Sequence, residues 1–278
     1  MQTEQSNFKL SDGLELSVRH WHDGAGIPVL LVHGYGEHIG RYAHVAAHLV
    51  AGGFDVWGYD ARGHGLSQGA RGFMAADDTL VTDLMEMFDE MMRRTGQRPI
   101  VVAHSMGGLV AALAVATHGL KPAALVLSSP ALRVRMNLFQ KILINMGLLL
   151  FKNKPIESKA VDPAHVSHDA KIVADYRSDA LNHAWISPRM ARMMRDGGDV
   201  VRQHAHCFDM PTLLIYAGDD RVIDASGSDD FGVLLNRHAA ATVRRYDSAY
   251  HEIFNESLAL REEILNHMST WMRQEAIK

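Results

Sequence analysis

PIVVAHSMGGLVAALAVATH (residues 99–118) places a serine between an apolar run and a run of small residues. The apolar run 99–105 is typical of a strand buried on both faces, and residues 109–118 are typical of a short helix. A serine on so tight a strand-to-helix turn projects its hydroxyl above the sheet. Ser105 is therefore the candidate nucleophile, although a simple helix N-cap would also put a serine here.

The neighbours of Ser105 fit the strained backbone that such a turn needs, because they are small. Gly107 and Gly108 follow it closely. Ala103 stands where the usual pattern G-x-S-x-G has its first glycine, and alanine is small enough to allow the turn.

Outward from this turn, apolar runs alternate with helical patterns. The runs are 28–34, 54–60, 123–130, 211–220 and 241–247, and the helical patterns are 42–51, 77–94, 231–237 and 257–274. Residues 7–21 alternate around an Asp12-Gly13 turn, which predicts a hairpin. The alternation predicts an α/β fold: a mostly parallel sheet with helices on both faces.

The alternation stops between residues 131 and 208, where no clear strand run occurs. This segment holds an apolar helical stretch at 136–151, a polar section and the helical pattern SPRMARMMRDGG. We interpret residues 131–208 as a helical cap inserted into a core made of residues 1–130 and 209–278.

Where a serine nucleophile stands on a strand-to-helix turn of this kind, its partners follow in chain order, first the acid and then the histidine. The strand run 211–217 leads into Asp219 and Asp220, and the last strand run leads into His251. His251 would take the proton of Ser105, and one aspartate would orient the imidazole. On residue order alone both aspartates remain candidates, and a surface histidine is the alternative for His251.

The first central run ends in Val32-His33-Gly34-Tyr35-Gly36. Its glycines let the loop bend over the nucleophile. The backbone N–H groups of Tyr35 and Met106 are therefore the candidate oxyanion hole, since both would point at the reacting carbonyl. A simple glycine turn is the alternative.

Three motifs give the chain a family resemblance: HGYGEHIGRYAHVAAHL (33–49), DARGHGLSQG (60–69) and AHSMGG (103–108). The chain resembles the monoacylglycerol lipase and lysophospholipase group of α/β-hydrolases over nearly its whole length. Matching AGDDRVID (217–224) to that group's acid motif favours Asp220 over Asp219, and its final Tyr-His motif matches Tyr250 and His251.

The resemblance implies a serine ester hydrolase that cleaves monoacylglycerol-like esters to fatty acid and glycerol through an acyl-enzyme. It places Glu37 and Arg41 at the polar end of the substrate pocket, and a structural ion pair is the alternative for them. Lysophospholipase, general carboxylesterase or thioesterase activity are alternatives, and a non-catalytic ligand-binding protein is a remote one.

The apolar stretch of the cap suggests three roles. It would cover an acyl tunnel, contact a membrane surface as a peripheral patch, or form a buried face of the cap. Its side chains include Leu138, Ile142, Leu143, Met146, Leu148 and Leu149.

Composition limits the partners. The net charge is −4, so nothing suggests nucleic-acid binding, and the expected partner is a small-molecule acyl ester; no oligomeric state is indicated. The single cysteine, Cys207, and a polar beginning without signal-peptide features predict a cytoplasmic protein. Two histidine pairs, His44 with His48 and His204 with His206, lack the rest of a zinc motif. We therefore expect no metal and no cofactor.

Overall fold

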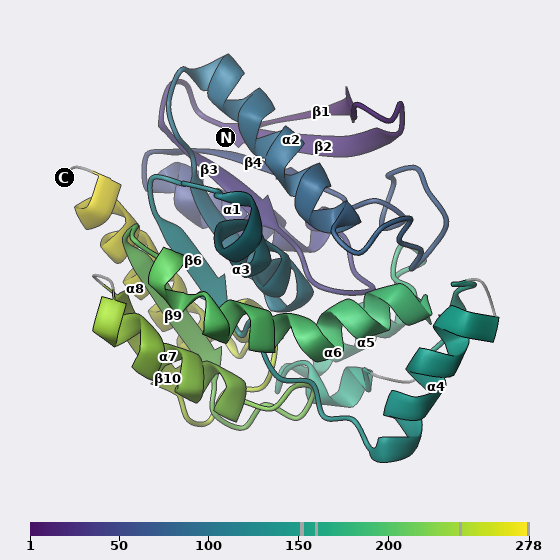
Figure 1. Ribbon diagram of the computed structural model, residues 1–278. Helices are drawn as coiled ribbons and strands as arrows, with labels where there is room; N and C mark the ends of the chain where they lie inside the picture. Colours follow the sequence, from purple (N-terminus) through teal and green to yellow (C-terminus); the bar gives the residue numbers. More distant parts are fainter. Residues whose placement is uncertain (151–152, 159–160, 239–240, 277–278) are drawn as a thin grey trace.

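The computed structural model describes residues 1–150, 153–158, 161–238 and 241–276. The chain is built around a central sheet (Figure 1). Its strand order is β1-β2-β4-β3-β5-β6-β9-β10. The β1–β2 and β2–β4 pairs are antiparallel, and all other pairs are parallel. The strands are β1 (Gln2–Lys9), β2 (Glu15–His22), β3 (Ile27–Val32), β4 (Phe54–Tyr59), β5 (Ile100–His104), β6 (Leu125–Ser128), β9 (Thr212–Ala217) and β10 (Ala241–Tyr246).

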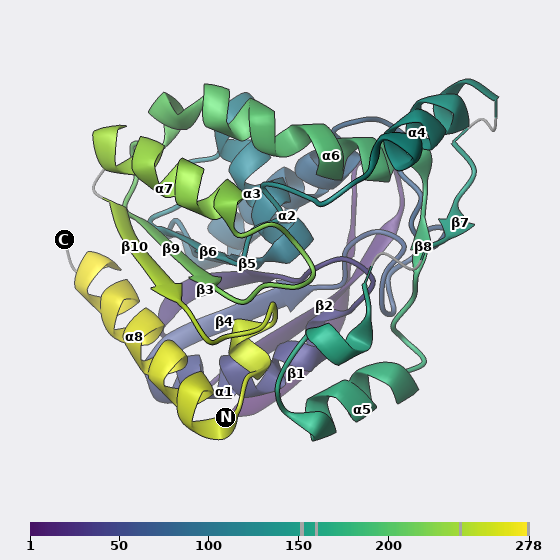
Figure 2. The same cartoon turned by 90° about the horizontal axis from the view of Figure 1, so that it is seen from below.

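Helices cover both faces of the sheet (Figure 2). The helices α1 (Ala43–Ala51) and α8 (Leu258–Ala276) lie on one face, and α2 (Thr79–Thr95), α3 (Ser105–His118) and α7 (Ser226–His238) lie on the other. Each face has its own apolar core: Leu49 and Met268 belong to the first, and Leu84 and Leu109 to the second. Burial on both faces is why the central strands read as continuous apolar runs.

The predicted fold class is confirmed, and so are the hairpin and the six apolar runs predicted as strands. The start of one helix differs from the prediction. The helix after β5 begins at Ser105 itself rather than at residue 109, because the turn has no connecting loop. This places Ser105 at the positive end of a helix.

Residues 131–208 contain α4 (Leu138–Leu150), α5 (Ala170–Ser178) and α6 (Pro188–Gln203). They also contain a short antiparallel pair, β7 (Ile156–Glu157) and β8 (Trp185–Ile186), which was not predicted. Strands of two residues are too short to show an alternating pattern. Of the predicted apolar stretch 136–151, Phe151 lies outside the described residues.

The helix α6 joins this segment to the core by packing on α3, and α4 packs on α6 (Figure 1). Neighbouring residues fix the start of α6: Pro188 occupies its first turn, and the Ser187 side chain accepts a hydrogen bond from the N–H of Met190. A Cβ at Gly198 would lie 1.7 Å from the carbonyl oxygen of Leu132. Glycine is therefore what permits this close approach.

Short 3-10 turns complete the described chain. They are η1 (Ile39–Tyr42), η2 (Pro163–His165), η3 (Ala205–Cys207) and η4 (Ile253–Asn255).

Candidate active site

The turn between β5 and α3 holds Ser105 in a left-handed conformation, with φ of 51°. Such a φ is rare for a residue with a side chain, and it indicates a backbone held by its surroundings. The glycines after it have little room: a Cβ at Gly107 would lie 2.4 Å from the His33 carbonyl oxygen, and one at Gly108 would lie 2.9 Å from Pro130. Close packing thus explains the small residues that the sequence places here.

His251 connects Ser105 to Asp220. The Nε2 atom of His251 lies 2.8 Å from Ser105 Oγ, and its Nδ1 lies 2.6 Å from Asp220 Oδ2. In the neutral tautomer that suits both contacts, the serine hydroxyl donates to Nε2 and Nδ1–H donates to the carboxylate. All three side chains are buried.

The two neighbouring aspartates after β9 have different environments. Asp220 is 4 % exposed, and its Oδ1 accepts hydrogen bonds from the N–H groups of Val222 and Ile223, each at 2.9 Å. Asp219 turns away from His251 and pairs with Arg221 near the surface. Of the two aspartates, Asp220 is therefore the one that contacts the imidazole of His251.

The protonation of this pair follows from its contacts. Burial opposes ionisation of Asp220, but the charge of His251 and the donated hydrogen bonds outweigh it and lower the pKa of the carboxyl. Burial lowers the pKa of His251, but Asp220 outweighs it and raises that pKa above its usual value. His251 is thus a stronger base than an ordinary histidine.

The loop after β3 lies against the nucleophile. A Cβ at Gly34 would lie 3.2 Å from the Ser105 Cβ. His33 fixes the loop: its Nδ1 lies 2.7 Å from the Gly34 carbonyl, and its Nε2 accepts a hydrogen bond from the N–H of Ala61. Tyr35, the next residue, lies in the wall of the pocket beside Ser105.

Met106, the other candidate oxyanion donor, is the second residue of α3. A backbone N–H in the first turn of a helix has no acceptor within that helix. This N–H is therefore available to a developing oxyanion beside Ser105, where the helix dipole also favours negative charge.

Residues 131–208 contact both loops of the site. The N–H of His183 donates to the carbonyl oxygen of Gly36 at 2.8 Å, and the N–H of Glu252 donates to that of Val166 at 2.8 Å. Gly36 has φ of 71°, and a Cβ there would lie 2.3 Å from the His183 carbonyl oxygen. Glycine at 36 therefore serves this contact as well as the turn.

Glu37 and Arg41 form part of a buried ion network. Arg41 Nη1 donates to Glu37 at 2.5 Å and to Glu252 at 2.7 Å, and its Nη2 donates to Glu252 at 2.7 Å. Glu37 also accepts from the N–H of Gly34 and from the Tyr42 hydroxyl, each at 2.7 Å. Burial would raise the pKa of Glu37, but Arg41 keeps it low.

Glu37 and Arg41, which the resemblance placed together at the polar end of the pocket, have different positions in the structure. Glu37 lies on the pocket wall near Ser105, whereas Arg41 lies behind that wall and does not line it. Arg41 instead binds two carboxylates and lies 4.7 Å from the Tyr176 ring centroid. Its contacts match the structural ion pair that the sequence left open.

The pocket above Ser105 measures about 640 Å³, counting its open mouth. Three polar side chains of its lining, Glu37, Glu252 and Tyr176, make up what we call the polar wall. Eight apolar side chains of the lining make up what we call the apolar wall: Val134, Met136, Val161, Val166, Ile186, Met194, Val222 and Ile223. A pocket with these two walls suits a ligand with a polar head and a hydrocarbon chain.

Sequence reasoning missed Tyr176 and Glu252. Glu252 directly follows His251, and this adjacency was the available signal. Tyr176 lies on α5, and no sequence pattern indicated that it reaches the site.

None of the described apolar side chains of α4 lines the pocket. Six of them are exposed to solvent: Leu138, Phe139, Ile142, Leu143, Met146 and Leu149. Leu148 is half-buried. The six exposed side chains therefore neither line the pocket nor form a buried face of the segment 131–208. Within the described part of the chain, no helix is both long and apolar enough to span a membrane.

Comparison of the sequence with known proteins identifies the family to which the chain is similar. The family described as "Serine aminopeptidase, S33" matches residues 27–258. A monoacylglycerol lipase of Mycolicibacterium smegmatis is 32% identical over 88% of this chain and 87% of its own length. An uncharacterized abhydrolase domain-containing protein of Dictyostelium discoideum is 30% identical over 99% of this chain, which spans only 29% of that protein.

A solved structure has the same architecture over its full length. The crystal structure of Paleococcus ferrophilus monoacylglycerol lipase superposes with a TM-score of 0.80, covering 99% of this chain and all of the other, at 26% identity.

Proposed function

The chain belongs to the serine aminopeptidase S33 family of α/β-hydrolases and is an ester hydrolase, and from this premise we propose that it cleaves monoacylglycerols to fatty acid and glycerol. The observation that carries the proposal is the hydrogen-bonded series Ser105–His251–Asp220 beneath a pocket with one polar and one apolar wall. Ser105, His251 and Asp220 are the proposed catalytic triad.

In the acylation step, Ser105 Oγ attacks the ester carbonyl while His251 Nε2 takes its proton. The carbonyl oxygen becomes an oxyanion, which the N–H groups of Tyr35 and Met106 stabilise. As the tetrahedral intermediate collapses, the imidazolium gives the proton to the leaving glycerol oxygen. Asp220 holds the imidazole and stabilises its positive charge, and Ser105 is left carrying the acyl group.

Deacylation repeats these steps with water. His251 takes a proton from water, the hydroxide attacks the acyl carbonyl, and the proton passes to Ser105 Oγ as the ester bond breaks. The products are the free serine and a fatty acid. Both halves of the reaction, as proposed, use only the protein's own groups, the substrate and water.

The charges of the polar wall favour glycerol over a phosphorylated head group. Glu37, Arg41 and Glu252 together carry two carboxylates and one guanidinium, and only the two carboxylates line the pocket. A phosphate beside them would meet like charge in a poorly hydrated site. Glycerol hydroxyls can instead donate to carboxylates, so lysophospholipids should be poorer substrates than monoacylglycerols.

The same proposal includes the cap. Residues 1–130 and 209–278 would form the hydrolase core, and residues 131–208 the cap that supplies much of the apolar wall. The exposed apolar face of α4 would rest on the lipid surface from which the substrate is drawn. The single cysteine fits a reducing compartment, and we propose a cytoplasmic location.

The direct test uses purified protein and a substrate panel. Monoacylglycerols of several chain lengths, lysophospholipids, acyl thioesters and p-nitrophenyl esters are compared by kcat/KM, with fluorophosphonate labelling of Ser105. Monoacylglycerols should give the highest kcat/KM, and Ser105→Ala should remove both turnover and labelling. The substrate assignment would be abandoned if lysophospholipids or thioesters were preferred, and the mechanism if Ser105→Ala stayed active.

A further inference from the structure

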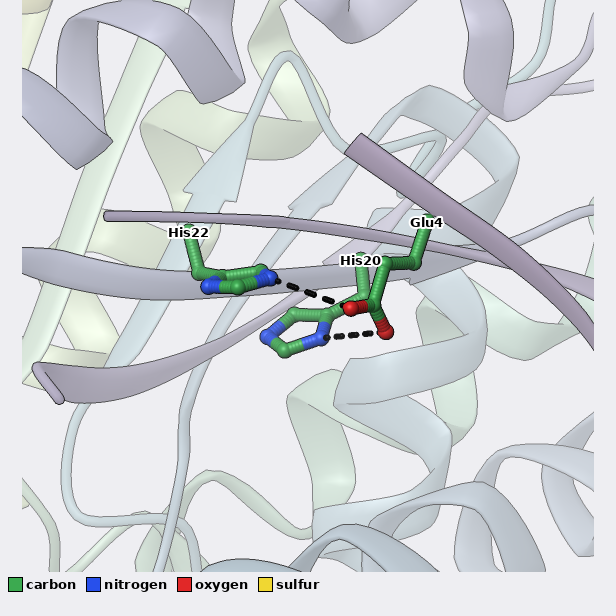
Figure 3. Close-up of side chains that lie close together, drawn as sticks. All are labelled: Glu4, His20 and His22. Atoms are coloured by element: carbon green, nitrogen blue, oxygen red, sulfur yellow. Dashed lines mark ion pairs between the residues drawn. The ribbon is translucent and has the colours of Figure 1, made fainter. Parts of the chain in front are cut away.

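Glu4, His20 and His22 meet on one face of the β1–β2 hairpin (Figure 3). Glu4 lies directly opposite His20 in the strand register, and His22 lies two residues along on the same face. Glu4 Oε2 lies 3.9 Å from His20 Nδ1, and Glu4 Oε1 lies 3.5 Å from His22 Nε2. One carboxylate oxygen of Glu4 and one ring nitrogen from each histidine all lie within 4.8 Å of one another.

Asp55 orients one of the imidazoles. His20 Nε2 lies 2.5 Å from Asp55 Oδ1, and the other oxygen of Asp55 accepts a hydrogen bond from Trp57 Nε1 at 3.1 Å. The Trp57 ring also stacks on His20 at 4.0 Å between centroids. When the Nε2 proton is donated to Asp55, the neutral ring presents a lone pair at Nδ1, towards the Glu4 carboxylate. Carboxylate–histidine pairs of this kind commonly orient metal ligands.

The Nε2 atom of His22 is a second, independent observation that points to a bound cation. This atom is buried and makes no hydrogen bond within the described part of the chain. The His22 ring stacks on His20 at 4.4 Å between centroids with 21° between the ring planes, so both rings must tilt for their in-plane lone pairs to meet at one ion. A buried ring nitrogen without a hydrogen-bond partner is uncommon, and a cation between it and Glu4 would satisfy it.

We propose that Glu4, His20 Nδ1 and His22 Nε2 bind a divalent transition-metal ion, zinc being the expected one. Zinc binds imidazole nitrogen and carboxylate oxygen at about 2.0–2.1 Å in a tetrahedral arrangement, which sets ligand atoms about 3.4 Å apart. The measured separations of 3.5 and 3.9 Å join the two ring nitrogens to different oxygens of the Glu4 carboxylate, and the Glu4 side chain, which is 66% exposed, is free to turn one oxygen towards both nitrogens. Water would take the fourth position, and imidazole ligands disfavour magnesium and calcium.

The site would be structural rather than catalytic. β1 is an edge strand on which every residue except Phe8 is exposed, so little apolar burial fixes it to the sheet. A metal held by Glu4 on β1 and two histidines on β2 would cross-link these strands. β4 and β3 separate β2 from β5, the strand that leads to Ser105.

The histidine pair that sequence spacing suggested on α1 is engaged elsewhere. His44 donates to the Phe254 carbonyl oxygen at 2.8 Å, and His48 Nε2 lies 3.0 Å from Ser269 Oγ. The Glu4 site escaped the sequence because its ligands come from two strands and meet only through the register.

The test measures zinc binding to the full-length protein after treatment with a chelator. Calorimetry should give one zinc per chain, and cobalt in its place should give the visible absorption of a tetrahedral site. Zinc should also raise Tm. His22→Gln and Glu4→Gln should abolish tight binding and the Tm increase, while Asp55→Asn, which removes only the orienting carboxylate, should weaken binding by about 10- to 100-fold.

His206→Gln is the matched control, since His206 is exposed and lies beside His204 on η3. It should bind zinc like the unaltered protein. The proposal is overturned if the unaltered protein takes up no zinc, or if His22→Gln and Glu4→Gln bind zinc with unchanged affinity. Ester hydrolysis, measured in parallel, should be the same in all four variants, so failure of the metal site would leave the proposed function untouched.

Discussion

Asp220 contacts His251 at 2.6 Å through one carboxylate oxygen, while its other oxygen accepts two backbone N–H groups. The carboxylate is thus fixed from both sides, and its position does not depend on the histidine alone. This explains how one of two adjacent aspartates becomes the partner of His251 while the other remains at the surface.

Replacing these aspartates one at a time tests that difference. Asp220→Asn should lower kcat by about 10⁴-fold, because the amide no longer stabilises the imidazolium and favours the wrong tautomer. Asp219→Asn should keep most of the activity, since it loses only a contact with Arg221 near the surface. Steady-state kinetics on one monoacylglycerol measures both, and the reverse pattern would assign the acid to Asp219.

The pH dependence of hydrolysis should report the raised pKa of His251. His251 must be neutral to accept the Ser105 proton, so activity is absent at low pH and rises as the pH passes through its pKa. The acidic limb of kcat/KM should therefore have its midpoint above the usual 6.5. In Asp220→Asn the carboxylate that raises this pKa is gone while burial remains, so the midpoint of the residual activity should move to lower pH. A limb at or below 6.5 in the unaltered protein would contradict this assignment.

Arg41→Ala should destabilise the protein by about 3–5 kcal/mol, because it leaves the buried carboxylates of Glu37 and Glu252 without their cation. Urea unfolding measures the loss. Arg93→Ala is the control, since the Arg93 side chain is 71% exposed and its pair with Glu90 lies at the surface. That change should leave the free energy of unfolding nearly unchanged. Equal losses in the two variants would mean that the Arg41 network is not a structural element.

Ala103→Gly restores the glycine that the usual turn pattern has. Ala103 is fully buried in β5, so the change removes a buried methyl group and adds backbone freedom to a strand. Stability should fall by about 1–2 kcal/mol, whereas kcat should change less than threefold because the alanine already permits the turn. Urea unfolding and kinetics on the same preparation check both, and a large gain in kcat would show that Ala103 strains Ser105.

The parts of the fold and of the site that are determined by residues close together in the sequence were predictable. The turn around Ser105 is one such part, because small residues, a buried strand and a helix adjoin it in the chain. The two-residue strands β7 and β8 leave no periodic trace. Of the polar wall, Glu37 was predicted, whereas Tyr176 escaped because it reaches the pocket from α5, far from Ser105 in sequence. Side chains that meet only through packing or strand register leave no local signal.

The hydrogen bonds from His183 to Gly36 and from Glu252 to Val166 tie residues 131–208 to two loops that approach Ser105 from different strands. Both loops are thereby fastened to the same segment, which would act as a lid in the proposed cap role. A lid that swings outward would release the oxyanion loop and the histidine loop together, and their spacing across the reacting carbonyl would be lost. Opening for substrate entry would therefore switch the hydrolase off, and small water-soluble esters, which need no lid movement, should still require the lid to be shut.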